Sequence, residues 1–64
     1  MKFMPRIVID PLLTVEEVAD FLALELRSIY KLIAQKELRA TKVMNRWRIR
    51  RRDLEAYLRR NANR

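Results

Sequence analysis

From residue 14 onward, the apolar residues of the chain recur at helical spacing. The positions that lie at i, i+3, i+4 and i+7 in the first such segment are Val15, Val18, Ala19 and Leu22. Thr14 stands directly before this run and Glu17 follows three positions later, a pairing that caps the N-termini of helices. The pattern predicts an amphipathic helix over residues 15–22.

A second helical pattern covers residues 26–36 and is basic on one side. Its apolar side holds Leu26, Ile29, Leu32 and Ile33. The opposite side and its flanks hold Arg27, Ser28, Tyr30, Lys31, Ala34 and Gln35. Because only residues 23–25 separate the two predicted helices, the pair is typical of a helix-turn-helix motif.

In the next segment the spacing of apolar residues changes from helical to alternating. Basic and apolar residues alternate over residues 46–50, which predicts a half-buried strand with Trp47 and Ile49 facing inward. Residues 40–43 can pair with it as a hairpin that turns at Met44 and Asn45. Since Met44 tolerates a left-handed backbone poorly, a four-residue loop is the alternative.

The remaining segments complete one small domain. A third helix is predicted over residues 51–61, with an inner stripe of Leu54, Tyr57 and Leu58. Residues 1–11 are expected to form an N-terminal arm or a short strand, and residues 62–64 a frayed end. The order of elements within residues 12–61 indicates a mainly α fold with a small β-hairpin, a winged helix-turn-helix domain.

The composition excludes several classes of chemistry. The 64 residues contain no cysteine, histidine or glycine, which rules out disulfides, thiolate–imidazole metal sites and glycine-rich phosphate loops. We expect no cofactor, no metal and no enzymatic activity. Neither a signal peptide nor a membrane span is recognisable, so an intracellular, cytoplasmic location is expected.

The charge is strongly divided along the chain. Of its net +7, residues 1–25 contribute two cations and five anions, while residues 26–64 contribute thirteen cations and three anions. A folded domain with this basic half favours a polyanionic partner, double-stranded DNA before a membrane. A basic interaction module that binds an acidic protein is the alternative from a different class.

Several segments resemble the excisionase family in their order and spacing. They are residues 12–22, 29–33, 37–38, 46–49 and 53–58, so that the resemblance covers residues 12–59. It implies a small winged helix-turn-helix domain related to the MerR regulators. It further implies a phage- or prophage-encoded recombination directionality factor, which binds side by side on attachment-site DNA, bends it and directs a phage-type integrase toward excision. A transcriptional regulator of a phage or plasmid is the alternative role.

The chain departs from this family at its turns. Members of the family commonly have glycine where Ala23, Lys36 and Met44 stand. We therefore expect Ala23 either to adopt a left-handed backbone or to belong to a turn that is built differently.

Two groups of side chains are the candidate DNA contacts. The second predicted helix offers Arg27, Ser28, Tyr30, Lys31 and Gln35 to the major groove. Arg27 can donate two hydrogen bonds to guanine O6 and N7, and Lys31 can reach guanine or phosphate. The resemblance places the hairpin wing along the minor groove, with Arg46 inserted and Arg48, Arg50, Lys42 and Asn45 beside it. Arg51 and Arg52 are candidate phosphate contacts, because cations at a helix start oppose its dipole.

Overall fold

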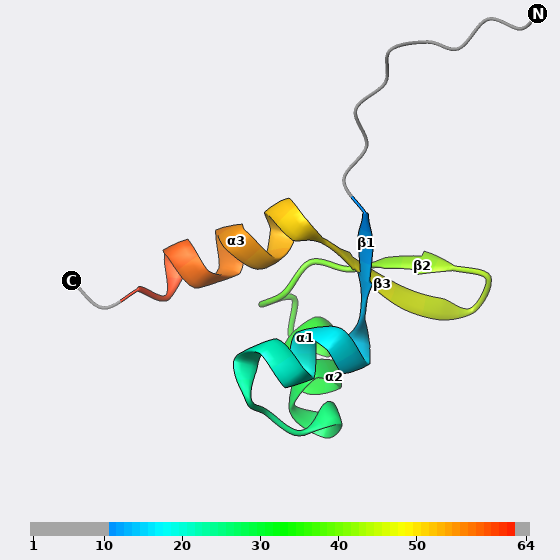
Figure 1. Ribbon diagram of the computed structural model, residues 1–64, viewed down its shortest axis with the longest axis horizontal. Helices are drawn as coiled ribbons and strands as arrows, with labels where there is room; N and C mark the ends of the chain where they lie inside the picture. Colours follow the sequence, from blue (N-terminus) through cyan, green and yellow to red (C-terminus); the bar gives the residue numbers. More distant parts are fainter. Residues whose placement is uncertain (1–10, 63–64) are drawn as a thin grey trace, which may run out of the picture.

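The computed structural model describes residues 11–62 of the chain. The arm or strand predicted for residues 1–11 therefore lies outside the described residues except for Pro11, and so does most of the predicted frayed end. The elements in chain order are β1 (Leu12–Thr14), α1 (Val15–Leu22), α2 (Leu26–Ala34), β2 (Thr41–Val43), β3 (Arg46–Arg50) and α3 (Arg51–Arg60). Three helices and a small antiparallel sheet make a winged helix-turn-helix fold (Figure 1).

The start of α1 matches the sequence prediction in both its boundary and its cap. The Oγ1 of Thr14 accepts a hydrogen bond from the backbone N–H of Glu17 at 3.0 Å, and the backbone N–H of Thr14 donates to Oε1 of Glu17 at 2.8 Å. This reciprocal pair satisfies two backbone donors that the helix itself leaves unpaired. The first helix is thus fixed at the residue where β1 ends.

Both helices of the motif end on a left-handed residue that is not glycine. Ala23 has φ 58°, and the N–H of Leu24 donates to the carbonyl of Ala19 at 2.9 Å. Lys36 has φ 65°, and the N–H of Glu37 donates to the carbonyl of Leu32 at 2.9 Å. A bond that reaches back five residues across a left-handed residue is the Schellman arrangement, in which glycine is the usual occupant. The turn after α1 therefore adopts the left-handed backbone, one of the two expectations for Ala23, without a glycine.

The sheet has the order β1–β3–β2, and its first strand was not anticipated from the sequence. β1 is three residues long, too short to display an alternating pattern. Arg48 is paired on both sides, with Thr14 of β1 and with Thr41 of β2. The base of the hairpin is therefore three-stranded, whereas its tip, where Val43 pairs with Arg46, is two-stranded.

The hairpin turns over two residues. Met44 has φ 51° and Asn45 has φ 67°, and Val43 pairs with Arg46 directly across them. Positive φ at both central residues is the signature of a type I′ turn, whose twist matches that of the flanking strands. The two-residue turn is thus confirmed, and the alternative prediction of a four-residue loop is wrong.

The core lies between the two helices of the motif, β3 and α3. Its buried residues are Val15, Val18, Ala19, Ile29, Ile33, Leu38, Ile49 and Leu54. Two positions predicted on inner stripes are instead exposed, Leu26 at 42% and Leu58 at 38%, because a core this small covers only part of each stripe. Leu38, in the connection after α2, is buried and takes a place in the core that helical periodicity does not reveal.

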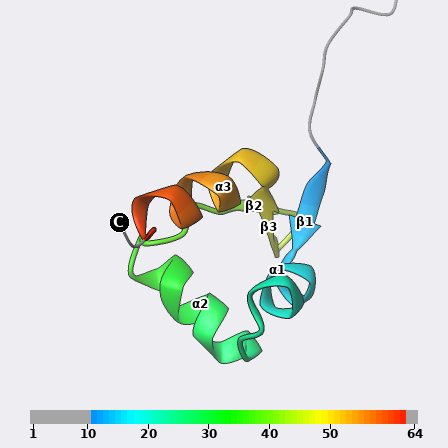
Figure 2. The same cartoon turned by 60° about the vertical axis from the view of Figure 1, so that its left-hand side comes forward.

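The three-dimensional arrangement leaves the hairpin projecting. α1 and α2 pack together beside the sheet, the hairpin extends to one side of them and α3 leaves in the other direction (Figure 1). The end of α3 returns toward the connection that follows α2 (Figure 2), where Arg60 donates to the backbone carbonyl of Glu37. Within residues 11–62, no helix is long and apolar enough to cross a membrane.

Candidate nucleic-acid interface

One face of α2 carries polar side chains that the core does not use. Ile29 and Ile33 are buried, while Arg27, Tyr30 and Lys31 are exposed and Ser28 is half-buried. The helix ends at Ala34 rather than near residue 36, so Gln35 caps it and is not part of its face. The structure therefore brings Arg27, Tyr30 and Lys31 together with Ser28 at their edge, and places Gln35 at the end.

Arg27 has an acidic neighbour that the sequence pattern does not reveal. The Nε of Arg27 donates to Oε1 of Glu25 at 2.7 Å, and the two side chains are 87% and 69% exposed. Glu25 is the N-cap of α2, but its side chain makes no cap hydrogen bond. Its extended backbone turns the carboxylate toward Arg27 instead, an arrangement that helical spacing alone does not show.

The arginines of the wing share one face of the sheet. Arg46, Arg48 and Arg50 alternate along β3, and residues that pair directly across strands lie on the same face. Arg48 is half-buried and donates from Nη1 to the carbonyl of Trp47 at 3.1 Å, whereas Arg46 and Arg50 are exposed. Asn45 lies in the turn beside Arg46, as the sequence predicted.

Lys42 does not share the strand face of these arginines. It pairs with Trp47, so it belongs to the opposite face of the hairpin, and its Nζ lies 5.3 Å from the centroid of the Trp47 ring. This distance is within range of a cation–π interaction. Trp47 itself is half-buried and packs against the core, in agreement with its predicted inward position.

A groove of about 330 Å³ lies between α2, the start of α1 and the wing. The residues that line it are Val15, Glu16, Tyr30, Lys42, Asn45, Arg46, Trp47 and Arg48. Tyr30 on its α2 side is 46% exposed. The groove therefore connects the polar face of α2 to the wing, with four polar or charged wing residues and one carboxylate, that of Glu16.

The remaining candidates lie at the start of α3. Nε of Arg51 is 3.6 Å from Oε2 of Glu55, one helical turn later. A carboxylate of the same helix therefore offsets the unfavourable interaction of Arg51 with the helix dipole. Arg51 also lines a different cleft, between α1 and α3, with Phe21 and Leu58. Its position thus needs no nearby phosphate. Arg52 is exposed.

Comparison with known families agrees with this geometry. The sequence profile described as a helix-turn-helix domain matches residues 12–62, which is most of the chain. The chain belongs to the helix-turn-helix domain family. This family includes excisionase-like DNA-binding domains, and the match makes the protein a DNA-binding helix-turn-helix domain. Its partner in that role is double-stranded DNA. No curated protein and no solved structure matches the chain.

Proposed function

We propose that this helix-turn-helix domain recognises a specific duplex sequence, with α2 in the major groove and the wing in the adjacent minor groove. The observation that carries the proposal is the groove lined by both Tyr30 of α2 and residues 45–48 of the wing. One phosphate backbone separates a major groove from its neighbouring minor groove. A protein that reads both grooves has to accommodate that backbone between its two reading elements.

The exposed face of α2 has the donors that base reading requires. With Nε of Arg27 bound to Glu25, its two terminal nitrogens are left to donate to guanine O6 and N7. Lys31 lies one turn further along the same face and reaches guanine or phosphate. Ser28 and Tyr30 contact the backbone or a base edge from the flanks of the helix.

The wing contributes electrostatic rather than sequence-reading contacts. Arg46 is exposed beside the turn, where an arginine suits the negative potential of a narrow A·T-rich minor groove. Arg48 and Arg50 meet phosphates along the outer face of β3. Lys42 lies on the opposite face of the hairpin but lines the groove together with Arg46 and Arg48, so cations from both faces of the wing border the groove.

The biological role that we propose is that of a recombination directionality factor. The support is the excisionase-like order of segments over residues 12–59, which lies within the family match. Binding would bend attachment-site DNA, and phosphate contacts would offset the cost of the deformation. The role implies adjacent copies on the DNA, an integrase as a functional partner and a place beside the nucleoid.

Selection of bound duplexes from a random library, followed by footprinting, tests the DNA-binding mode. We expect an enriched site with protection in neighbouring major and minor grooves. Arg27→Glu and Arg46→Glu should each weaken binding to that site at least about tenfold, because each replaces a phosphate or base donor by a repelled carboxylate. Arg59→Glu, with the same change of charge at the far end of α3, is the control.

Two results would overturn the proposed mode. One is the absence of enrichment over random DNA, which would leave a generic basic binder. The other is an affinity that hardly changes with salt, since each neutralised phosphate should contribute about 0.9 to the slope of log affinity against log salt. Pairing of the wild type with an acidic protein, with no DNA binding by the wild type, would favour the interaction module.

The role is tested separately by a search of the neighbouring genes for a phage-type integrase, followed by an excision assay with that integrase. We expect excision to require the protein, and the DNA in the complex to be bent. Specific binding that leaves excision unchanged but represses a neighbouring promoter would assign the transcriptional role instead.

A further inference from the structure

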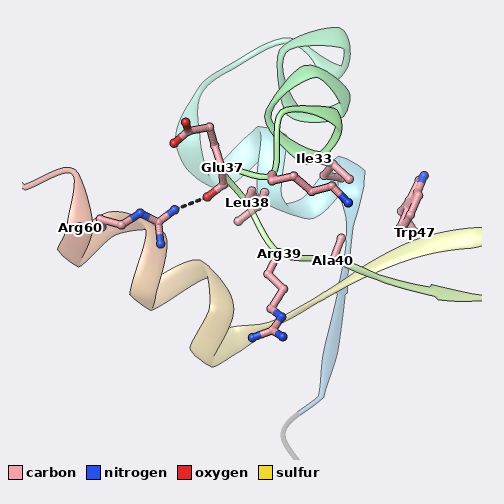
Figure 3. Close-up of a pocket in the computed structure, with 8 residues that line it drawn as sticks. Ile33, Glu37, Leu38, Arg39, Ala40, Trp47 and Arg60 are labelled. Atoms are coloured by element: carbon pink, nitrogen blue, oxygen red, sulfur yellow. Dashed lines mark hydrogen bonds between the residues drawn. The ribbon is translucent and has the colours of Figure 1, made fainter.

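A second basic cleft lies outside the surfaces assigned above. It has a volume of about 510 Å³ and is formed by the end of α2, the connection that follows it and the end of α3 (Figure 3). It is lined by Lys36 and Arg39, both from the connection after α2, and by Arg60 from the end of α3. None of the three forms an ion pair with another of residues 11–62. Three uncompensated cations around one hollow indicate an anionic ligand.

The acidic residue of the cleft does not neutralise these cations. Glu37 contributes its backbone carbonyl, which accepts a hydrogen bond from Nη2 of Arg60, while its carboxylate points away from the cleft (Figure 3). A guanidinium has five N–H donors, and this bond uses one of them. Arg60 is thus anchored at the cleft and keeps donors for an outside acceptor.

The cleft is held in place by the fold. Its inner wall includes Ile33 and Leu38, which are buried in the core at 8% and 1% exposure. Lys36 is fixed by the Schellman turn that ends α2. The positions of the cations on the backbone are therefore set before any ligand arrives, which lowers the ordering cost of binding.

The position of Trp47 relates this cleft to the proposed DNA surface. The same residue lines both the cleft and the groove between α2 and the wing. A backbone that follows the groove can therefore continue past Trp47 toward Lys36 and Arg39. Because the cleft and the groove share Trp47, one DNA backbone can contact both of them, whereas an acidic protein segment bound in the cleft would not need the groove beside it. The shared residue therefore favours DNA as the ligand.

We propose that this cleft binds backbone phosphates of the DNA beyond the base pairs contacted by α2 and the wing, and so lengthens the footprint on one side. The inference rests on the proposed function. Guanidinium and ammonium groups contact phosphates without reading bases. The cleft should therefore add affinity and salt dependence but leave the selected sequence unchanged.

The experiment measures how much each cation of the cleft contributes to the salt dependence of DNA binding, with Arg59 of α3, the neighbour of Arg60, as the control. Arg60→Gln, Lys36→Gln and Arg39→Gln should each lower the slope of log affinity against log salt by about 0.9. Arg59→Gln removes the same charge from a residue outside the cleft and should leave the slope unchanged. On a duplex trimmed to the protected base pairs of the α2 and wing contacts, wild type and all variants should bind alike.

Several outcomes would overturn the inference. One is an equal fall in the salt slope for Arg59→Gln, which would indicate an effect of bulk charge only. The others are unchanged salt slopes for the three cleft variants, and binding of an acidic peptide in place of DNA by the cleft. Arg60→Lys retains the positive charge of residue 60 even where the hydrogen bond to the carbonyl of Glu37 is lost, so it separates the effect of the charge from that of the bond. Thermal unfolding identifies any variant that fails to fold. If Arg27→Glu leaves DNA binding intact, the proposed function fails instead, which is a separate result.

Discussion

Arg27 at the start of α2 donates from Nε to Oε1 of Glu25, the N-cap of the same helix, at 2.7 Å. The bond occupies the one guanidinium nitrogen that an end-on contact with guanine does not need. It also restricts a long side chain that is otherwise exposed. In the proposed docking mode Glu25 should therefore have two opposing effects on DNA binding, because it orients Arg27 but also brings a negative charge to the phosphates.

Glu25→Gln should separate these effects. Non-specific duplex binding should tighten about twofold to fivefold, the scale of an exposed ion pair, because a repulsive charge is lost. The preference for the selected duplex over a scrambled one should fall, because Arg27 loses its anchor. Fluorescence anisotropy with both duplexes measures the ratio. Glu55→Gln on α3 removes an equal charge and should not change that ratio; an unchanged ratio in Glu25→Gln would contradict the orienting role.

Glycine at the left-handed positions should stabilise the domain. Ala23→Gly, Lys36→Gly and Met44→Gly each relieve a left-handed backbone strain of about 1–2 kcal/mol, partly offset by the entropy of glycine. We expect each to raise the free energy of unfolding by about 0.5–1 kcal/mol. Chemical denaturation followed by circular dichroism gives the values. Ala56→Gly, in the middle of α3, should instead destabilise by about 1 kcal/mol.

Loss of the reciprocal cap at α1 should weaken the whole fold. Thr14→Ala removes the acceptor for the N–H of Glu17 and should cost about 1 kcal/mol, which corresponds to about 4–8 °C in Tm for a domain of this size. Thr14→Ser keeps the hydroxyl and should lie close to wild type. Equal melting temperatures for the alanine and serine variants would show that the cap contributes nothing.

The position of Lys42 predicts a spectroscopic effect. Because its Nζ lies over the Trp47 ring, Lys42→Gln should shift the fluorescence of the only tryptophan and destabilise the domain by about 0.5 kcal/mol. Arg50→Gln, on the other face of the sheet, removes the same charge and should leave the emission unchanged. A shift of the emission in Arg50→Gln but not in Lys42→Gln would instead place Lys42 on the same face as the arginines.

The parts of the fold that sequence predicted are those governed by neighbouring residues. The boundaries of α1 followed from Thr14 and Glu17, and the hairpin from alternation around Trp47. β1 could not be predicted, since a strand of three residues is defined by the partner that it pairs with. The burial of Leu38 likewise depends on where the chain returns after α2 rather than on any local period.

For the candidate interface, the sequence named residues, and the structure added how they lie relative to one another. The face of Lys42 was open to prediction: a two-residue turn at Met44 and Asn45 sets Lys42 against Trp47, because strand register fixes the side of every residue. The contact of Glu25 with Arg27 was not, because residues two apart do not meet within a helix, and only the extended backbone of the N-cap allows it.

The pairing of β3 has a mechanical consequence. This strand starts beside the hairpin turn, is held on both sides at Arg48, and passes into α3 with no intervening loop. The base of the wing therefore has no hinge, and only its two-stranded tip can twist. In the docking mode proposed above, a wing that cannot swing would impose its own angle on the minor groove. The DNA, rather than the protein, would then have to change shape when the two meet.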